Sequence, residues 1–218
     1  QDGDEDILLG NWGLNSKFNP KPKTPLKMYY LDFDKNGNTE TVMAYNKNGS
    51  YYPVHSKDEL GGQLTVIKKR YVRHKDYALK TMEEIFTPFS LNQAQLNEVH
   101  SFASGYLENN NGEFSKFVEF PYQLQLAPIN SFQKVSINNK GLIIVGGNSY
   151  RSNNYQGTYT SLKGYIFSSL DSLVPVSDYG IDSFKEEIRA IEKINFRDHN
   201  LLLLAGNNGL VKTYRYEN

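Results

Sequence analysis

The chain has 218 residues, and its 24 Lys and Arg balance 24 Asp and Glu, which excludes a global field that would attract nucleic acid or an anionic membrane. The absence of cysteine excludes disulfides, thiolate metal sites and cysteine nucleophiles, and no apolar run is long enough for a transmembrane helix. The chain is 39% hydrophobic and can therefore bury a core, and its 23 Asn and 17 Gly favour many short strands over a helical bundle.

The sequence begins at Gln1 without Met and runs directly through an acidic stretch into Ile7-Leu8-Leu9. Such a start indicates that an export signal has been removed or that a longer polypeptide precedes Gln1. The repeats described next favour the longer polypeptide.

A short apolar run that ends in a small or aromatic residue followed by Asn recurs along the chain. It occurs at residues 7–11, 142–148 and 201–207, and more weakly at 41–46. Such runs, bounded by Gly and Asn, are typical of buried strands. Further strand-like stretches precede three of these runs and follow three of them, at residues 27–31, 132–137, 191–196, 50–54, 162–167 and 210–216.

The repeated unit is therefore a strand, a tight loop, a buried strand, a turn and an outer strand. Once the long insertion at residues 56–105 is removed, the period approaches that of a four-stranded propeller blade. We expect an all-β fold in which residues 1–218 form a single partial β-propeller domain of about three and a half blades. A β-sandwich remains the alternative, because its strands also alternate with Gly and Asn turns.

The most specific motif is Asp32-Phe33-Asp34-Lys35-Asn36-Gly37-Asn38-Thr39-Glu40. Oxygen-bearing side chains at positions 1, 3, 5 and 9, with Gly at position 6, are what a hard cation needs. The main-chain carbonyl of Asn38, at position 7, would complete the ligand set. An EF-hand requires Glu at position 12, but that position is Met43 within an apolar run. The loop is therefore expected to lie between strands, and a solvated Asp/Asn turn is the alternative interpretation.

A truncated copy of this loop is predicted at the N-terminus. Aligning residues 7–9 with 41–43 gives the second, partial loop the acidic residues Asp2, Asp4 and Asp6 at positions 5, 7 and 9. Positions 1 and 3 would lie before residue 1. The corresponding loops at 138–141 and 197–200 are too short and too poor in carboxylates to hold Ca²⁺, so they are expected to be plain turns.

Residues 56–105 interrupt the repeats and are predicted to be a helical insertion within one blade. Leu60, Leu64, Ile67 and Tyr71 follow a helical spacing, and Ser56 with Glu59 forms a capping box at the start. A second helical stretch contains Leu79, Met82, Ile85 and Phe86 and is expected to stop at Pro88. The helices should bury Leu60, Leu64 and Ile67, and should expose Lys68, Lys69 and Arg73 to water.

The motif Asp-x-Asp-x-Asn-Gly-x-x-Glu before an apolar strand resembles the calcium loop of the FG-GAP/VCBS-repeat proteins, the integrin-α-type β-propeller family. Residues 10–15, 28–45 and 102–109 are similar to the C-terminal blades of large exported VCBS-repeat proteins of Bacteroidetes. The resemblance implies a seven-bladed propeller, calcium in the blade loops and an extracytoplasmic location at the cell surface, in the periplasm or in secreted form. This chain differs in having one intact loop, with Glu at position 9. We expect one Ca²⁺, bound by Asp32, Asp34, Asn36, Glu40 and the Asn38 carbonyl.

Other signals are weaker. Residues 68–75 are locally basic and fit an anionic polysaccharide, a lipid headgroup or an acidic protein face, but also the solvated side of a helix. The four histidines lack the spacing of a paired metal site, and no nucleophile elbow occurs. Trp12 and the tyrosines fit sheet packing better than sugar stacking.

These observations predict a non-enzymatic, calcium-binding propeller module of an exported or cell-surface protein. It would bind protein or glycan, or act as a scaffold in an envelope assembly. Its partners would be other protein chains or the missing N-terminal part of the same protein, and not nucleic acid. The alternative is a carbohydrate-active enzyme, a glycosidase or lyase, built on a propeller. Carboxylates that converge in a central pocket would favour the enzyme.

Overall fold

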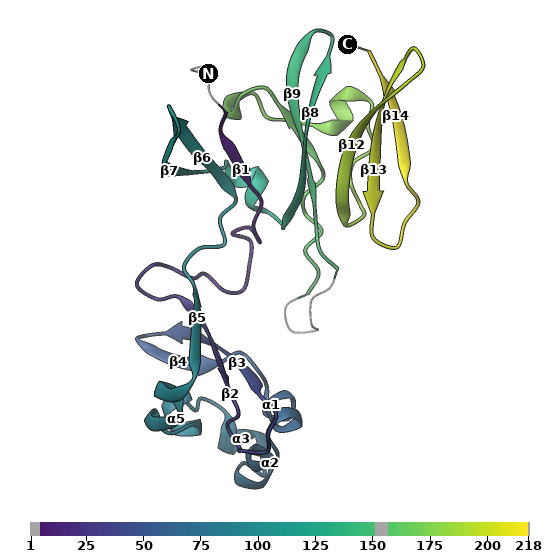
Figure 1. The fold of residues 1–218 in the computed structure, drawn as a ribbon. Coiled ribbons are helices and arrows are strands. Elements are labelled where there is room, and N and C mark those ends of the chain that lie inside the picture. Colours follow the sequence, from purple (N-terminus) through teal and green to yellow (C-terminus); the bar gives the residue numbers. More distant parts are fainter. Residues whose placement is uncertain (1–4, 151–156, 218) are drawn as a thin grey trace. The chain divides into compact units, whose positions relative to one another are not determined.

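The structure is a computed structural model that describes residues 5–150 and 157–217. Contacts divide the chain into two compact units. Unit 1 comprises residues 1–17 and 102–218, and unit 2 comprises residues 18–101. The second unit is therefore inserted into the sequence of the first (Figure 1).

Unit 1 contains three antiparallel sheets that follow one another along the chain. The first has the order β1-β6-β7, the second β11-β10-β9-β8 and the third β12-β13-β14. The strands are β1 (Ile7–Leu9), β6 (Gly105–Asn110), β7 (Glu113–Glu119), β8 (Ile129–Ile137), β9 (Lys140–Gly147), β10 (Tyr165–Phe167), β11 (Val174–Pro175), β12 (Ile188–Phe196), β13 (His199–Gly206) and β14 (Lys212–Tyr216). Short 3₁₀ helices occur at Tyr122–Gln125, Leu170–Ser172 and Val176–Tyr179.

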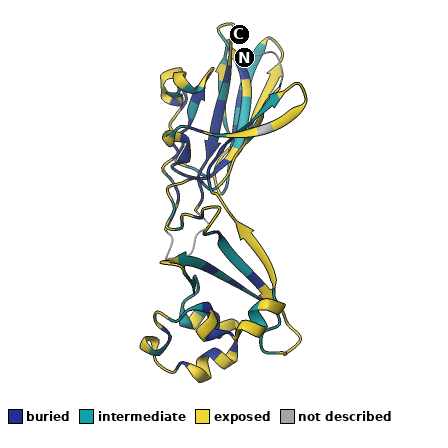
Figure 2. Cartoon of the chain, turned by 90° about the vertical axis from the view of Figure 1, so that its left-hand side faces the viewer, coloured by how far each residue is buried: buried dark blue, intermediate teal, exposed yellow. Residues whose placement is uncertain are grey.

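The core of unit 1 lies between these sheets. One cluster joins the second and third sheets through fully buried residues that include Ile144, Ile166 and Leu204. Another cluster is built around Leu124, Leu162 and the aromatic ring of Phe120. Buried positions therefore occur in β9, β10 and β13, as the apolar runs of the sequence predict. Figure 2 shows the buried stretches of the sheets in dark blue.

Unit 2 consists of one four-stranded sheet and a layer of short helices. The sheet has the order β4-β3-β2-β5 and is formed by β2 (Leu26–Leu31), β3 (Glu40–Lys47), β4 (Ser50–Pro53) and β5 (Gln95–Val99). Three consecutive strands and a fourth that returns beside the first constitute the Greek-key order. The helices lie in the long connection between β4 and β5: α1 (Lys57–Gln63), α2 (Thr65–Arg70), α3 (His74–Tyr77), α4 (Met82–Ile85) and α5 (Pro88–Gln93).

The helices begin where the sequence provides caps. Ser56 and Glu59 form a complete capping box at α1, and Thr81 and Glu84 form another at α4. Pro88 occupies the first turn of α5, where its missing N–H costs nothing. The core of the unit is formed by Tyr29, Val42 and Ala44 of the sheet together with apolar residues of the helices, including Leu60, Leu64, Ile67, Met82 and Ile85.

Strands are confirmed at every repeat, and the described part of the chain is mostly β. The prediction of a buried strand is wrong for β1, because Ile7 and Leu9 are 41% and 36% exposed at the edge of its sheet. The burial of Leu60, Leu64 and Ile67, and the exposure of Lys68, Lys69 and Arg73, are also as expected. The four sheets are open, and none of them closes on itself within residues 5–150 and 157–217.

The boundaries of the insertion differ from the prediction of one domain with helices over 56–105. The helices occupy residues 57–93, and residues 95–99 form the exposed strand β5. Residues 18–101 form a unit with its own core, because they include four strands as well as the helices.

The helical segments also differ from those that the spacing predicts. The stripe from Leu60 to Tyr71 belongs to two helices, because Leu64 has an extended backbone between α1 and α2. Leu79 was expected within the second helical stretch, but it lies in the turn between α3 and α4 and is 81% exposed. Pro88 begins a helix and does not end one. No helix of the described residues is long and apolar enough to cross a membrane.

Candidate metal centre

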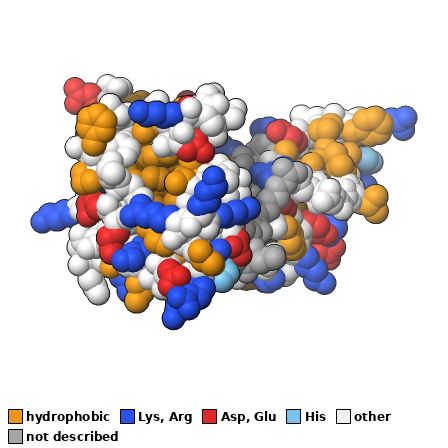
Figure 3. Space-filling model, turned by 90° about the horizontal axis from the view of Figure 1, so that it is seen from below, with side chains coloured by type: hydrophobic (Ala, Val, Ile, Leu, Met, Phe, Trp, Pro, Cys, Tyr) orange, Lys and Arg blue, Asp and Glu red, His pale blue; other side chains and the backbone are white. Residues whose placement is uncertain are grey.

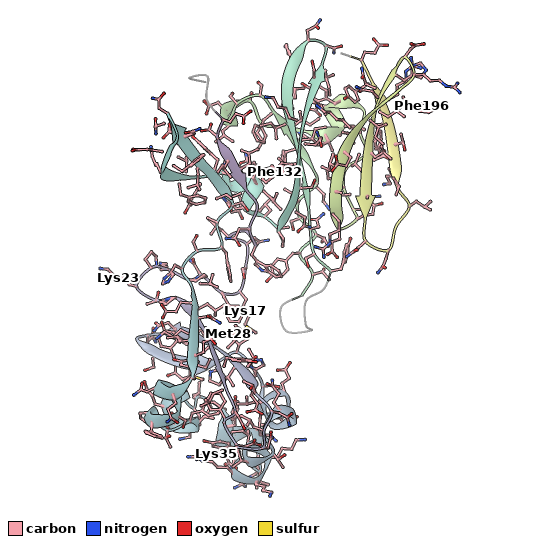
Figure 4. The ribbon with its side chains drawn as sticks, in the orientation of Figure 1. Lys17, Lys23, Met28, Lys35, Phe132 and Phe196 are labelled. Atoms are coloured by element: carbon pink, nitrogen blue, oxygen red, sulfur yellow. The ribbon has the colours of Figure 1, made fainter. Side chains whose placement is uncertain are left out.

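The acidic loop connects β2 to β3 in unit 2. Leu31 pairs with Glu40 at the end of the hairpin, so that residues 32–39 form the connection. Lys35 and Gly37 have positive φ angles of 59° and 88°. Gly tolerates this conformation without strain, which allows the sharp turn that the spacing predicts. Lys35 marks the loop in Figure 4.

Asp32 organises the loop through both of its carboxylate oxygens. Asn36 N–H donates to Asp32 Oδ1 at 3.0 Å, and Gly37 N–H donates to Asp32 Oδ2 at 2.8 Å. Asn38 N–H donates to Asn36 Oδ1 at 2.8 Å. The loop is therefore held closed by hydrogen bonds to side chains at its first and fifth positions.

Glu40 is the most deeply buried carboxylate of the loop, with 5% of its surface exposed. Its Oε2 accepts a hydrogen bond from Phe33 N–H at 2.9 Å. The ring of Phe33 packs against Phe86 with a centroid distance of 4.4 Å. Phe33 thus anchors the loop against Phe86, the residue that follows α4.

Three carboxylates converge in this loop. Asp32, Asp34 and Glu40 each contribute an oxygen, and these oxygens lie within 4.8 Å of one another. Among the described residues, no Lys, Arg or His forms an ion pair with any of the three. Asp34 Oδ1 is buried and lacks a hydrogen-bond partner in the described part of the chain. A buried carboxylate oxygen without a partner is costly unless a cation satisfies it.

The structure brings together three of the five predicted ligands. Asn36 and Asn38 belong to the same loop, but the side-chain oxygen of Asn36 accepts the Asn38 N–H. The assignment of both residues as ligands stays a prediction. Carboxylate oxygens are the donors that hard divalent cations such as Ca²⁺ take, and the three carboxylates of this loop fit an ion of that class.

The partial second loop is described only at its end. Asp2 and Asp4 lie outside the described residues. Asp6 Oδ1 accepts a hydrogen bond from Asn109 N–H at 3.0 Å, and the Asn109 side chain donates to the carbonyl of Glu5. In the described residues Asp6 therefore ties β1 to the β6–β7 hairpin.

Asn148, which belongs to one of the recurring Gly-Asn pairs, has a structural role that the repeat pattern does not reveal. Asn148 is fully buried, and its side chain donates to the carbonyls of Leu162 and Glu186 and accepts from Leu162 N–H. Its own N–H donates to the Pro128 carbonyl at 2.8 Å. Asn148 therefore links the end of β9 to three other segments of unit 1, at Pro128, Leu162 and Glu186. The recurrence of Gly-Asn after three apolar runs is the sequence signal that points to this residue.

Unit 1 also contains a shallow pocket of about 410 Å³ where its sheets meet. Its polar lining includes Asn130, Ser149 and Arg189, and Trp12 supplies an aromatic ring. The nearby Glu187 is 2% exposed and is paired with Arg189. Asp and Glu are absent from the described lining of this pocket.

Among the histidines, His55 has a pKa that the protein environment shifts. Burial lowers the pKa of its imidazole, and the nearby carboxylate of Glu59 opposes that effect. Its Nδ1 is buried without a hydrogen-bond partner among the described residues. This histidine belongs to the packing of unit 2, because its carbonyl accepts a hydrogen bond from the Tyr77 hydroxyl.

Comparison of the chain with models of protein families, with curated proteins and with solved structures finds no match.

Proposed function

We propose that this chain is a non-enzymatic, calcium-binding module in which Asp32, Asp34 and Glu40 hold one Ca²⁺. The observation that carries this proposal is the buried, unpartnered Asp34 Oδ1 within a cluster of three carboxylates. Two unit charges about 4.8 Å apart repel by roughly 3 kcal/mol at an effective dielectric constant near 20. A divalent cation would replace this repulsion by attraction and would satisfy the free oxygen.

We further propose that unit 1 is part of a β-propeller related to the FG-GAP/VCBS family. Its sheets follow one another along the chain, and each is a meander, as propeller blades are. Equivalent register shifts occur between Ile129 and Ser131 in β8 and between Ile188 and Ala190 in β12. The same strands are joined directly, because Ile191 N–H donates to Ser131 Oγ. Repeated blades with adjacent first strands account for these features.

Unit 2 does not have the strand order of a blade. Its β5 returns beside β2, whereas the last strand of a blade lies at the outer edge. We therefore assign the calcium loop to an inserted Greek-key unit and not to a propeller blade. The loop would bind Ca²⁺ in the β-loop-β context that its sequence predicts.

A binding or scaffold role is favoured over a glycosidase or lyase. A glycosidase needs two carboxyl groups that flank a substrate site. One pocket of unit 1 presents Trp12, Arg189 and amide groups, and no carboxylate among its described residues. A second pocket of unit 1, of about 550 Å³, includes Asp178 and Glu217 in its lining, and both residues are exposed to solvent. Partners would be other protein chains, a further part of the same polypeptide or a glycan, at an extracytoplasmic location.

The proposal is tested by calorimetric titration of the chain with Ca²⁺ and by thermal unfolding with and without a chelator. At a Ca²⁺ concentration ten times the dissociation constant, the bound ion should stabilise the fold by about 1.4 kcal/mol. Mg²⁺ should bind more weakly, because it demands stricter octahedral geometry.

Asp34→Asn gives a sharper test because its effect should change sign with the ion. Without Ca²⁺ the variant should melt above the wild type, since one repelling charge is gone. With Ca²⁺ it should melt below the wild type, since a ligand is lost. Asp198→Asn, in the exposed turn between β12 and β13, is the matched control. A melting temperature that does not respond to chelator or to Ca²⁺ in the wild type would overturn the calcium assignment.

A further inference from the structure

A strongly basic segment lies on the helical layer of unit 2. Residues 65–80 contain Lys68, Lys69, Arg70, Arg73, Lys75 and Lys80 but a single acidic residue, Asp76, in a chain whose formal net charge is zero. Most of their side chains are exposed. We call the exposed residues of 65–80 the basic helical surface.

Three of the six cations are engaged within the protein. Arg70 donates to the carbonyls of Ile85 and Glu84, Arg73 pairs with Asp76, and Lys80 pairs with Glu84 at 2.7 Å. Lys68, Lys69 and Lys75 form no ion pair with the described residues. Lys69 and Lys75 are therefore available to an external anion, and so is Lys68, whose attraction to the nearby Asp58 carboxylate is shared with Lys57 and His74.

Exposed apolar side chains lie between these cations. Val66 is 50% exposed, Val72 is 76% exposed and Leu79 is 81% exposed. The same segment buries Ile67, Tyr71 and Tyr77 in the core, so that its outward residues are held on a fixed support. Basic and hydrophobic side chains are interspersed on the helix-bearing face of unit 2 in Figure 3.

Leu79 combines two unfavourable features at one position. Its φ of 64° lies in the left-handed region, which is strained for a branched residue such as leucine. Its side chain nevertheless remains in solvent. Asn or Gly would adopt this turn at lower cost, and therefore the choice of leucine is not explained by the fold. An apolar surface that receives the side chain would explain it.

We infer that the basic helical surface binds the surface of an anionic phospholipid membrane. Lys68, Lys69 and Lys75 would contact the headgroups, while Val66, Val72 and Leu79 would enter the boundary between headgroups and acyl chains. An acidic polysaccharide or an acidic protein face would satisfy the lysines but would leave the apolar side chains without a partner. The inference is independent of the calcium site and of the propeller assignment.

The experiment is co-sedimentation of the full chain with vesicles of phosphatidylcholine alone and with about one third phosphatidylglycerol. Binding is expected to the anionic vesicles and to fall as salt is raised. Replacing Lys68, Lys69 and Lys75 together by Gln should weaken binding about 100-fold, since each lysine near an anionic surface contributes about fivefold.

The apolar contribution is tested with Leu79→Asn. Asn tolerates the left-handed conformation, so the melting temperature should be unchanged or higher while vesicle binding falls about tenfold. The matched control is Leu210→Asn, because Leu210 is 88% exposed in unit 1 and should not affect binding. A failure of the wild type to bind anionic vesicles would overturn the inference. So would binding that depends on the lysines but is unchanged in Leu79→Asn, which would indicate an acidic polymer as the partner.

Discussion

His55 makes the stability of unit 2 sensitive to mildly acidic pH. Burial lowers the pKa of His55 in the folded chain, so the unfolded chain binds the proton more readily near pH 6. Stability therefore rises with pH through this window and is lost as pH falls below about 6.5. The lowered pKa values of Glu59, Glu84 and Glu186 act in the same direction, but below the ordinary glutamate value of 4.5.

We expect His55→Asn to reduce the loss of melting temperature between pH 7 and pH 5.5, measured by differential scanning calorimetry. The backbone hydrogen bond from Tyr77 to residue 55 is retained in this variant. His100→Asn, at an exposed position, serves as the control and should keep the full pH dependence. An identical loss in wild type and His55→Asn would contradict the assignment.

Individual residues of the metal loop were predictable to different degrees. The alternation of oxygen-bearing residues with Gly37 was sufficient to place Asp32, Asp34 and Glu40 together. It was not sufficient to predict that Asn36 accepts a hydrogen bond within the loop, because Asx turns and cation loops share the same residue types. The role of Phe33 was also hidden, since its partner Phe86 lies on a distant segment.

At the scale of elements, close crossings of strands depend on glycine. A Cβ on Gly147 would collide with the backbone carbonyl of Pro128, which also accepts the Asn148 N–H. Gly147→Ala should therefore destabilise unit 1 by about 2–3 kcal/mol, because the crossing has to open.

The measurement is urea unfolding followed by fluorescence. Gly141→Ala lies in the same strand, has no heavy atom within 4 Å of the added Cβ and should change stability by less than about 0.5 kcal/mol. Equal stabilities for Gly147→Ala and Gly141→Ala would contradict this prediction. They would show that the Pro128 backbone can move away from residue 147 without cost.

The strands and the first residues of the helices were more predictable than the interruption between α1 and α2. The apolar runs that became β9 and β13, and the capping boxes at α1 and α4, are local signals that need no tertiary partner. The break at Leu64 joins two helices whose apolar residues keep a continuous spacing, so periodicity could not reveal it. Tertiary packing over the sheet sets that break.

For the whole molecule, the two units carry different spectroscopic signals. Trp12 is the single tryptophan of the chain and lies in unit 1, whereas helices α1 to α5 lie in unit 2. Ca²⁺ bound at Asp32, Asp34 and Glu40 should raise the unfolding midpoint seen by circular dichroism at the helix band and leave the tryptophan midpoint unchanged. Asp34→Asn should abolish the difference between the two probes. A shift of both midpoints by the same amount would mean that the units unfold cooperatively.

The division into units could not be predicted from periodicity. The run at 41–46 resembles the other repeats, but it belongs to a sheet in which β5 pairs with β2. Likewise, β1 pairs with β6, although all of unit 2 lies between these two strands in the sequence. Both pairings join segments that are far apart in sequence, and no local pattern records them.

The pairing of β1 with β6 also has a consequence for the order of folding. In an unstructured chain, residues 10–104 would form one long loop that must close before β1 finds its partner. The contacts of unit 2 are more local, and the pairing of Leu26 with Val99 brings the two ends of that unit together. If unit 2 folds first, the loop that remains is much shorter, and its closure costs roughly 1 kcal/mol less. Folding of unit 2 thus shortens the loop that unit 1 must close. Pairing of β1 with β6 should therefore be several-fold slower when unit 2 is prevented from folding.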